Sequence, residues 1–154
     1  MLLATLATLM VPAHAHAQGG RKLDIQPQHD LLFGTVIAGV PARTPPVDGA
    51  RAGQFALTGP NRSTVELVFS LPATMVSASG ATMPLTFGAS DAGVSATGAI
   101  TDQVSFDPRL PYTTSLSKTG RLTVFLGGMV TPSASQRAGG YTATVTLTVA
   151  VTSL

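Results

Sequence analysis

The 154-residue chain has no cysteine and no tryptophan, and it contains few histidines. Without thiols no disulfide can form, so packing and hydrogen bonds must hold the fold. A zinc site needs several histidine or cysteine ligands. The chain offers only His14, His16 and His29, of which the first two lie in the N-terminal segment. We therefore expect neither a metal ion nor another cofactor.

Side chains for catalysis are equally sparse. A Ser-His-Asp arrangement would have to use His29, which we interpret as an exposed turn residue. Glycoside hydrolysis needs two carboxylates across a cleft, but no aromatic platform accompanies the seven acidic residues. Asp102 and Asp107 follow no calcium-loop spacing, so we expect them to cap turns. The protein is accordingly predicted not to be an enzyme.

Charge is also scarce, because only 10% of the residues are charged and the net charge is +2. The nine basic residues are spread from Arg21 to Arg137, and only Arg21 and Lys22 are adjacent. Nucleic-acid binding needs clustered cations, usually with stacking aromatic side chains. We interpret the high isoelectric point as a small surplus on a weakly charged chain. The sequence predicts no basic patch and no nucleic-acid partner.

The N-terminus is apolar and uncharged up to Pro12, and Ala15 and Ala17 then form a small-residue site before Gln18. This pattern is typical of a secretory signal peptide, here residues 1–17, and the run is too short to span a bilayer. No basic residue precedes it, so either the true start lies upstream or the amino terminus alone supplies the charge. We expect residues 18–154 to be a single domain without a transmembrane anchor. Its expected location is the periplasm, the cell surface or the extracellular space.

The clearest structural pattern lies in residues 141–151, where Tyr141, Val145, Leu147 and Val149 alternate with threonines. Side chains alternate between the two faces of a strand, so one face is apolar and the other is mostly hydroxyl. Similar short runs occupy residues 54–58, 64–71, 83–87, 104–106 and 122–126, with glycine, proline and serine between them. Residues 22–25 also alternate, and Pro27 is expected to end that run. The prediction is an all-β antiparallel sandwich of about seven to nine strands.

Several segments together resemble the DUF4402 family of exported bacterial β-sandwich proteins. The resemblance rests on residues 32–34, 53–59, 67–72, 83–87 and 122–128 and on Gly140-Tyr141 before the last strand. That family is similar to spore-coat-U-type and fimbrial subunit domains. The resemblance implies an immunoglobulin-like topology and no catalytic residues.

These expectations favour an exported, non-catalytic structural or surface subunit that is fimbria-like or pilin-like and associates through strand edges. The candidate association strand covers residues 21–26, with Leu23 and Ile25 as its apolar side chains, and residues 31–37 could extend it. The candidate acceptor edge is the last strand, residues 141–151. Expected partners are a second copy or another exported subunit, together with a periplasmic chaperone. Two alternatives remain, a self-complete monomeric module that binds glycans or another surface, and a small secreted hydrolase.

Overall fold

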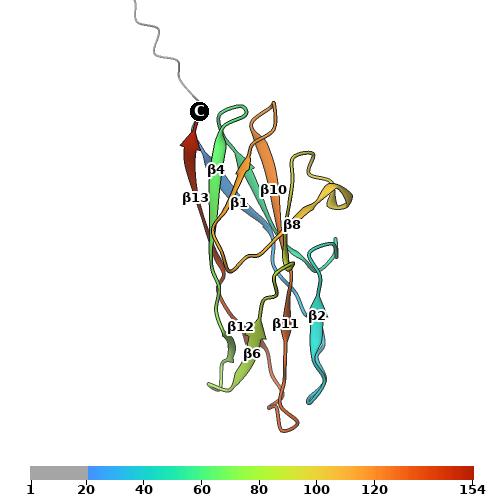
Figure 1. Cartoon of the computed structure of the whole chain (residues 1–154). Helices are drawn as coiled ribbons and strands as arrows, with labels where there is room; N and C mark the ends of the chain where they lie inside the picture. Colours follow the sequence, from blue (N-terminus) through green and yellow to red (C-terminus); the bar gives the residue numbers. More distant parts are fainter. Residues whose placement is uncertain (1–20) are drawn as a thin grey trace, which may run out of the picture.

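The computed structural model describes residues 21–154, which form antiparallel strands in three sheets (Figure 1). Within this range the chain has thirteen strands, one 3-10 turn (η1, Ile100–Asp102) and no α-helix. The predicted all-β class is therefore confirmed, and the arrangement is consistent with a β-sandwich. The predicted signal peptide, residues 1–17, lies outside the described residues.

The first sheet has five strands in the order β1-β3-β10-β7-β8. They are β1 (Asp24–His29), β3 (Gly53–Thr58), β10 (Arg121–Leu126), β7 (Ala92–Ser95) and β8 (Val104–Phe106). Among residues 21–154, β1 pairs only with β3, so its other edge has no partner strand in this part of the chain. The N-terminal segment of the described chain is thus an edge strand of its own domain.

The remaining strands form two sheets that follow one another along the molecule. One has the order β13-β4-β9, and the other has the order β12-β5-β6-β11-β2. Their bounds are β13 (Thr146–Ser153), β4 (Thr64–Ser70), β9 (Tyr112–Ser115), β12 (Tyr141–Thr142), β5 (Thr74–Ser77), β6 (Thr82–Thr86), β11 (Gly128–Val130) and β2 (Ala42–Thr44). Because β4 leads into β5 and β12 leads into β13 after three residues each, the two sheets continue one another. The molecule is elongated as a result (Figure 1).

The predicted count of seven to nine strands is wrong, because residues 21–154 contain thirteen. Three of the additional strands arise where long extended segments are each divided in two, at Pro72 and its neighbours, at Gly127, and at residues 143–145. Proline cannot donate to a ladder, which explains the first division. The strand that contains Ile25, β1, also continues through Pro27 to His29 instead of ending there. It can do so because proline is tolerated on an edge strand.

The core lies between the first sheet and the strands that face it. Its best-buried side chains are aliphatic and come from several strands: Leu57, Val65, Leu67, Val124, Leu126 and Val130. An aromatic row adds to it, because Phe69 stacks on Phe106 at a centroid distance of 6.4 Å and Phe106 stacks on Tyr112 at 4.2 Å. Apolar burial of this kind is the main stabilising contribution in such a domain.

The strand from Arg121 to Val130 crosses between sheets at Gly127. Its amide donates to the carbonyl of Asp91 at 2.7 Å. The Asp91 side chain is 3% exposed, pairs with Arg43 and accepts a hydrogen bond from the Gly88 amide at 2.7 Å. A buried carboxylate is tolerated only when it is paired in this way. Asp91 therefore fixes the loop that precedes β7 to the crossing point.

Candidate interaction surfaces

The acidic side chains serve local structure. Asp102 accepts a hydrogen bond from Thr97 at 2.8 Å, and Asp107 accepts one from the amide of Arg109 at 3.0 Å. Among residues 21–154, no three histidine, cysteine or acidic side chains gather as metal ligands would. His29 lies exposed at the end of edge strand β1. Asp107 thus caps its turn as predicted, whereas the Asp102 carboxylate accepts hydrogen bonds from the hydroxyls of Thr97 and Thr101 and from no backbone amide within the described chain.

Two acidic side chains, Asp107 and Asp48, have a pKa below the ordinary value of an aspartate. The Arg109 guanidinium donates to Asp107 at 2.8 and 2.7 Å, and this lowers the pKa of Asp107 to about 2. A side-chain hydrogen bond from Arg51 likewise lowers the pKa of Asp48 below its ordinary value. Hydrogen bonds to the charged form explain both shifts. Each pair is confined to one turn.

Of the candidate association residues, Ile25 lies near the N-terminal end of β1 and Leu23 immediately precedes that strand. Both are half-buried and pack against the hydrophobic core of their own domain. Ile25 lies opposite Leu57 of β3, and Asp24 lies opposite Thr58. The segment expected to join another chain is therefore paired within this chain, and only its outer edge remains free.

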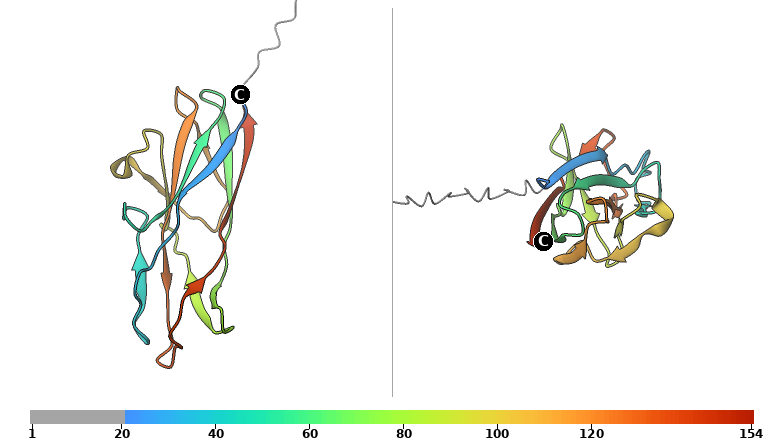
Figure 2. Two further views of the ribbon diagram at one scale, coloured as in Figure 1. Left: turned by 180° about the vertical axis from the view of Figure 1, so that it is seen from behind. Right: turned by 90° about the horizontal axis from the view of Figure 1, so that it is seen from above.

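The candidate acceptor strand is divided between β12 and β13. Leu147 is 8% exposed, Val145 and Val149 are half-buried, and all three contribute to the core. Thr146 and Thr148 on the alternate positions are exposed, as the sequence pattern predicts. Within the part of the chain that the structure describes, β13 pairs with β4 on one side only, so its other edge is free. β1 and β13 lie along the same side of the molecule (Figure 1, Figure 2).

An apolar groove adjoins the C-terminal part of β1 and the residues that precede β13. One part has a volume of about 340 Å³ and is lined by Phe55 and Val145 among others. A second part of about 700 Å³ is lined by Met83 and Val130 among others. The two parts share the lining residues Leu31, Leu32, Phe33, Met75 and Tyr141. They therefore form adjoining sections of one groove between residues 31–38 and the sheet that contains β12.

The wall formed by residues 31–38 is weakly attached. This segment forms no strand, although its composition is apolar. Leu32 donates a backbone hydrogen bond to Arg51 at 2.8 Å and Gly39 donates one to Ser133 at 3.0 Å, but residues 33–38 donate no inter-residue backbone hydrogen bond within the described chain. Ile37 is 68% exposed. Segments with few backbone hydrogen bonds and exposed apolar side chains open most easily.

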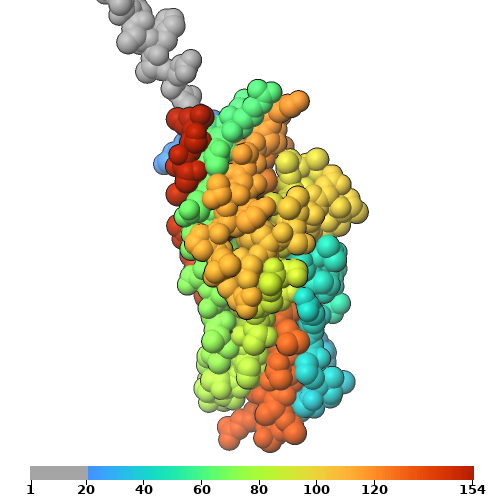
Figure 3. Space-filling view, viewed as in Figure 1, coloured from blue at the N-terminus to red at the C-terminus, as the bar shows by residue number. Residues whose placement is uncertain are grey.

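A second surface was not expected from the sequence. The tips of the β3–β4 and β9–β10 connections lie beside the N-terminal segment and the C-terminal residues at one end of the molecule (Figure 3). This end carries five of the nine basic residues, all exposed: Arg21, Lys22, Arg62, Lys118 and Arg121. The sequence-based prediction of dispersed charge without a basic patch is therefore wrong. We call these five residues the basic end.

Backbone contacts hold the two loop tips of the basic end together. The Gly59 amide donates to Gly120 at 2.8 Å, and the Arg62 amide donates to Ser117 at 3.1 Å. Gly120 has a φ of +70°, and a Cβ there would lie 2.1 Å from the carbonyl oxygen of Gly59. Only glycine permits so close an approach. The contact between two loops that each connect the first sheet with the β13-β4-β9 sheet thus unites basic residues that lie far apart in the sequence.

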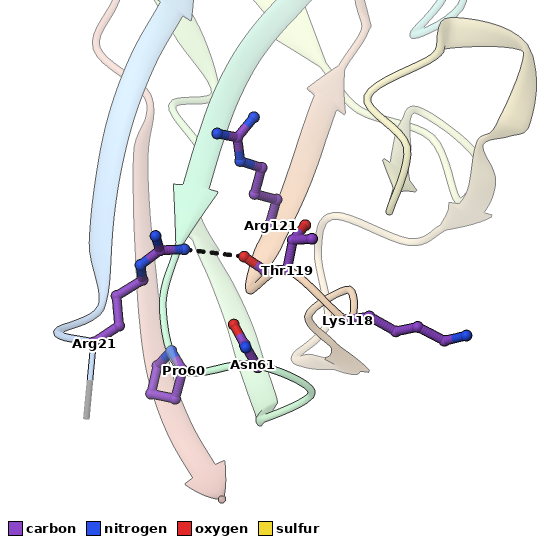
Figure 4. Close-up of a pocket in the computed structure, with 6 residues that line it drawn as sticks. All are labelled: Arg21, Pro60, Asn61, Lys118, Thr119 and Arg121. Carbon is purple, nitrogen blue, oxygen red and sulfur yellow. Dashed lines mark hydrogen bonds between the residues drawn. The ribbon is translucent and has the colours of Figure 1, made fainter. Parts of the chain in front are cut away.

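The side chains of this end line a pocket of about 710 Å³ (Figure 4). Arg21 donates to the Thr119 carbonyl at 3.0 Å, which fixes its guanidinium over the β9–β10 connection. Asn61 lies between the loops, and Lys118 points away from Arg21 and Arg121. The cations are therefore spread over the end of the molecule.

Comparison with family models finds no match to this chain, and comparison with the curated proteins finds none either. The resemblance to the DUF4402 family therefore stays a prediction. Between residues 21 and 154 there is no helix of sufficient length and apolarity to cross a bilayer.

Proposed function

We propose that this protein is an exported, non-catalytic structural or surface subunit with an immunoglobulin-like sandwich. It would associate with a second copy or with another exported subunit through its sheet edges, and a periplasmic chaperone would attend its export. The observation that carries this proposal is that the free edges of β1 and β13 lie on one side of the domain, near the apolar groove.

A strand from another chain could both pair with the free edge of β13 and fill the apolar groove. The free edge of β13 offers unpaired backbone groups, and the groove offers space for apolar side chains. A strand laid along this edge would form backbone hydrogen bonds with β13 and place alternate side chains in the groove. The natural candidate is residues 21–26 of another copy, because Leu23 and Ile25 already match an apolar surface of this fold.

Exchange of β1 between copies, in which the strand pairs with β3 of a neighbour and not with β13, is a second route to association and would be inexpensive in free energy. The strand would leave its ladder with β3 and form the same ladder in a neighbour, so most contacts would be conserved. The connection that must open is residues 30–41, in which residues 33–38 donate no inter-residue backbone hydrogen bond within the described chain. Few backbone hydrogen bonds would therefore be lost when this connection extends, and the main cost would be the removal of Leu31, Phe33 and Val36 from the core.

One observation favours the second candidate function, a self-complete monomeric binding module. β1 is paired with β3, and its apolar side chains reach the core of the same chain. A domain that already holds its terminal strand has less need of a donor from outside. The two candidates differ in one measurable property, which is association between copies.

The test is sedimentation of the purified protein over a wide concentration range. We expect the native chain to form concentration-dependent oligomers, and the double variant Leu23→Asp/Ile25→Asp to remain monomeric. Because both residues are half-buried, circular dichroism must show that the variant still folds. A matched control replaces two exposed apolar residues of the β8 region, Val104 and Leu110, which are 59% and 61% exposed.

The control double variant Val104→Asp/Leu110→Asp should assemble as the native chain does. A native chain that stays monomeric at every concentration, and in the presence of other exported subunits, would reject the subunit proposal in favour of the binding module. Equal loss of assembly in both double variants would show that added negative charge, and not the β1 strand, disrupts the contact.

A further inference from the structure

We infer that the basic end is a docking surface for a membrane that bears anionic phospholipid headgroups. This inference goes beyond the proposed function, because it uses the end of the molecule and not its edges. It rests on how the fold segregates charge and on the chemistry of the exposed groups at this end.

Charge is unevenly divided along the molecule. Residues 21–22, 58–63, 117–121 and 153–154 contain the five cations of the basic end and no acidic residue. The remainder holds all seven acidic residues and only four basic ones, so its formal charge is negative by three. Three of those four arginines are paired with aspartates: Arg43 with Asp91, Arg51 with Asp48, and Arg109 with Asp107.

The cations of the basic end have no such partners. No salt bridge within the described residues involves Arg21, Lys22, Arg62, Lys118 or Arg121. The nearest acid along β1, Asp24, accepts hydrogen bonds from Gln26 at 3.1 and 3.3 Å. Five exposed cations without intramolecular neutralisation create a positive potential that attracts anions from solution.

One of these cations occupies an unfavourable backbone position. Arg62 has a φ of +58° and is the single non-glycine residue with positive φ in the described chain. It follows Asn61 at the tip of the β3–β4 turn, where glycine would be favoured. An arginine at this position makes the turn less stable than a glycine would. The conformation of the turn therefore does not account for the presence of a basic residue at its tip. This makes Arg62 the best residue with which to separate binding from folding.

The arrangement fits an extended anionic surface better than one small anion. Lys118 points away from Arg21 and Arg121, so these three groups cannot converge on a single phosphate (Figure 4). The tips of the β3–β4 and β9–β10 loops, at the end of an elongated body, would instead meet several headgroups at once. Each basic residue near such a surface strengthens binding about fivefold.

Two further observations favour lipid over nucleic acid. The residues of the basic end include no aromatic side chain on which a base could stack. Leu154 at the C-terminus, which is 91% exposed, lies at the same end of the molecule and offers an apolar side chain to a membrane.

The experiment is flotation of the purified protein with phosphatidylcholine vesicles, with and without one-third phosphatidylglycerol. We expect binding only to the anionic vesicles, with steep loss as salt rises. Arg62→Gly should weaken binding about fivefold while the unfolding midpoint stays equal or rises. Joint replacement of Arg21, Lys118 and Arg121 by glutamine should abolish measurable binding.

The matched control is Arg137→Gln, which removes an exposed cation from the β11–β12 connection at the opposite end. It should bind vesicles like the native chain. Equal weakening by Arg137→Gln and Arg62→Gly would overturn the inference, because net charge alone would then explain binding. Absence of binding to anionic vesicles would also overturn it. So would salt-dependent binding to inorganic phosphate or to a DNA oligonucleotide without binding to vesicles. Oligomerisation measured without vesicles should be unchanged in Arg62→Gly, which keeps this test separate from that of the proposed function.

Discussion

Replacement of Gly127 by alanine tests the crossing of the long strand between sheets. The φ of Gly127 is not in the left-handed region, so alanine can adopt its backbone conformation. The obstacle is space. A Cβ at this position would lie 2.4 Å from the carbonyl oxygen of Thr44, 2.8 Å from the nitrogen of Pro46 and 2.9 Å from the carbonyl carbon of Pro45.

All three obstructing atoms belong to backbone that cannot move easily. Thr44 is fully buried and donates through its hydroxyl to the carbonyl of Leu32 at 2.7 Å. Two prolines follow it and restrict the local dihedral angles. Overpacking of a protein interior typically costs 1 to 3 kcal/mol. Because the clash here is with fixed backbone, we expect Gly127→Ala to lower the free energy of unfolding by about 3 kcal/mol.

Urea denaturation followed by far-ultraviolet circular dichroism measures this change. Gly140→Ala is the matched control, because a Cβ there meets no atom within 4 Å and its φ is not positive. The control should be neutral, or stabilising by up to about 1 kcal/mol through lower entropy of the unfolded chain. A loss of less than about 1 kcal/mol for Gly127→Ala would refute the reasoning, since it would mean that the segment carrying Thr44 yields freely.

Three further changes test other parts of the structure. Leu147→Asp should lower the free energy of unfolding by about 3 kcal/mol or more because it buries an unpaired charge, whereas Thr148→Asp on the exposed face should lower it by less than about 1 kcal/mol. Urea denaturation measures both changes, and equal losses would contradict the observed burial. Asp91→Ala should cost about 2 to 4 kcal/mol by the same assay, because the Gly88 amide loses its acceptor and the ion pair is broken. Nuclear magnetic resonance titration should show that Asp107 stays ionised down to about pH 2, and that Arg109→Gln returns its pKa toward 3.8. The contribution of that pair to stability is full above about pH 4 and is lost as pH falls through about 2; an unchanged pKa in the variant would contradict the role of Arg109.

Alternation in the sequence located the strands that have one apolar and one polar face. β4 and β13 were found in this way, because each has a solvated face and a core face. β7 was missed for the opposite reason. All four of its residues, Ala92–Ser95, are buried, and small residues covered on both faces show no period of two. Its pairing with β10 depends on residues about thirty positions away.

The sequence predicts the orientation of the last strand, but it does not predict the groove beside it. The facing of Val145, Leu147 and Val149 toward the core follows from their spacing alone. The groove could not be foreseen, because one of its walls is an apolar segment, residues 31–38, that forms no strand. An apolar run of this kind suggests a buried strand as readily as a weakly attached cover.

The basic end shows a more general limit. Arg62 and Lys118 lie 56 positions apart in the numbering, and only the contact between the β3–β4 and β9–β10 connections brings them together. A charge pattern read along the chain is informative for helices and for tails, where neighbours in sequence are neighbours in space. In a sandwich, each end of the molecule collects loops from distant strands. Dispersed charge in the sequence is therefore compatible with a strongly charged end.

The two proposed surfaces occupy different parts of an elongated body, and this has a consequence for how they could work together. The edges of β1 and β13 run along the side of the molecule, whereas the basic end lies at its tip (Figure 1). A chain attached by its tip to an anionic surface would keep both edges free for neighbouring chains. Attachment would also raise the local concentration of copies, which favours weak edge-to-edge association. If both proposals hold, oligomers should form at lower protein concentration on anionic vesicles than in solution, and Arg62→Gly should remove that difference without changing assembly in solution.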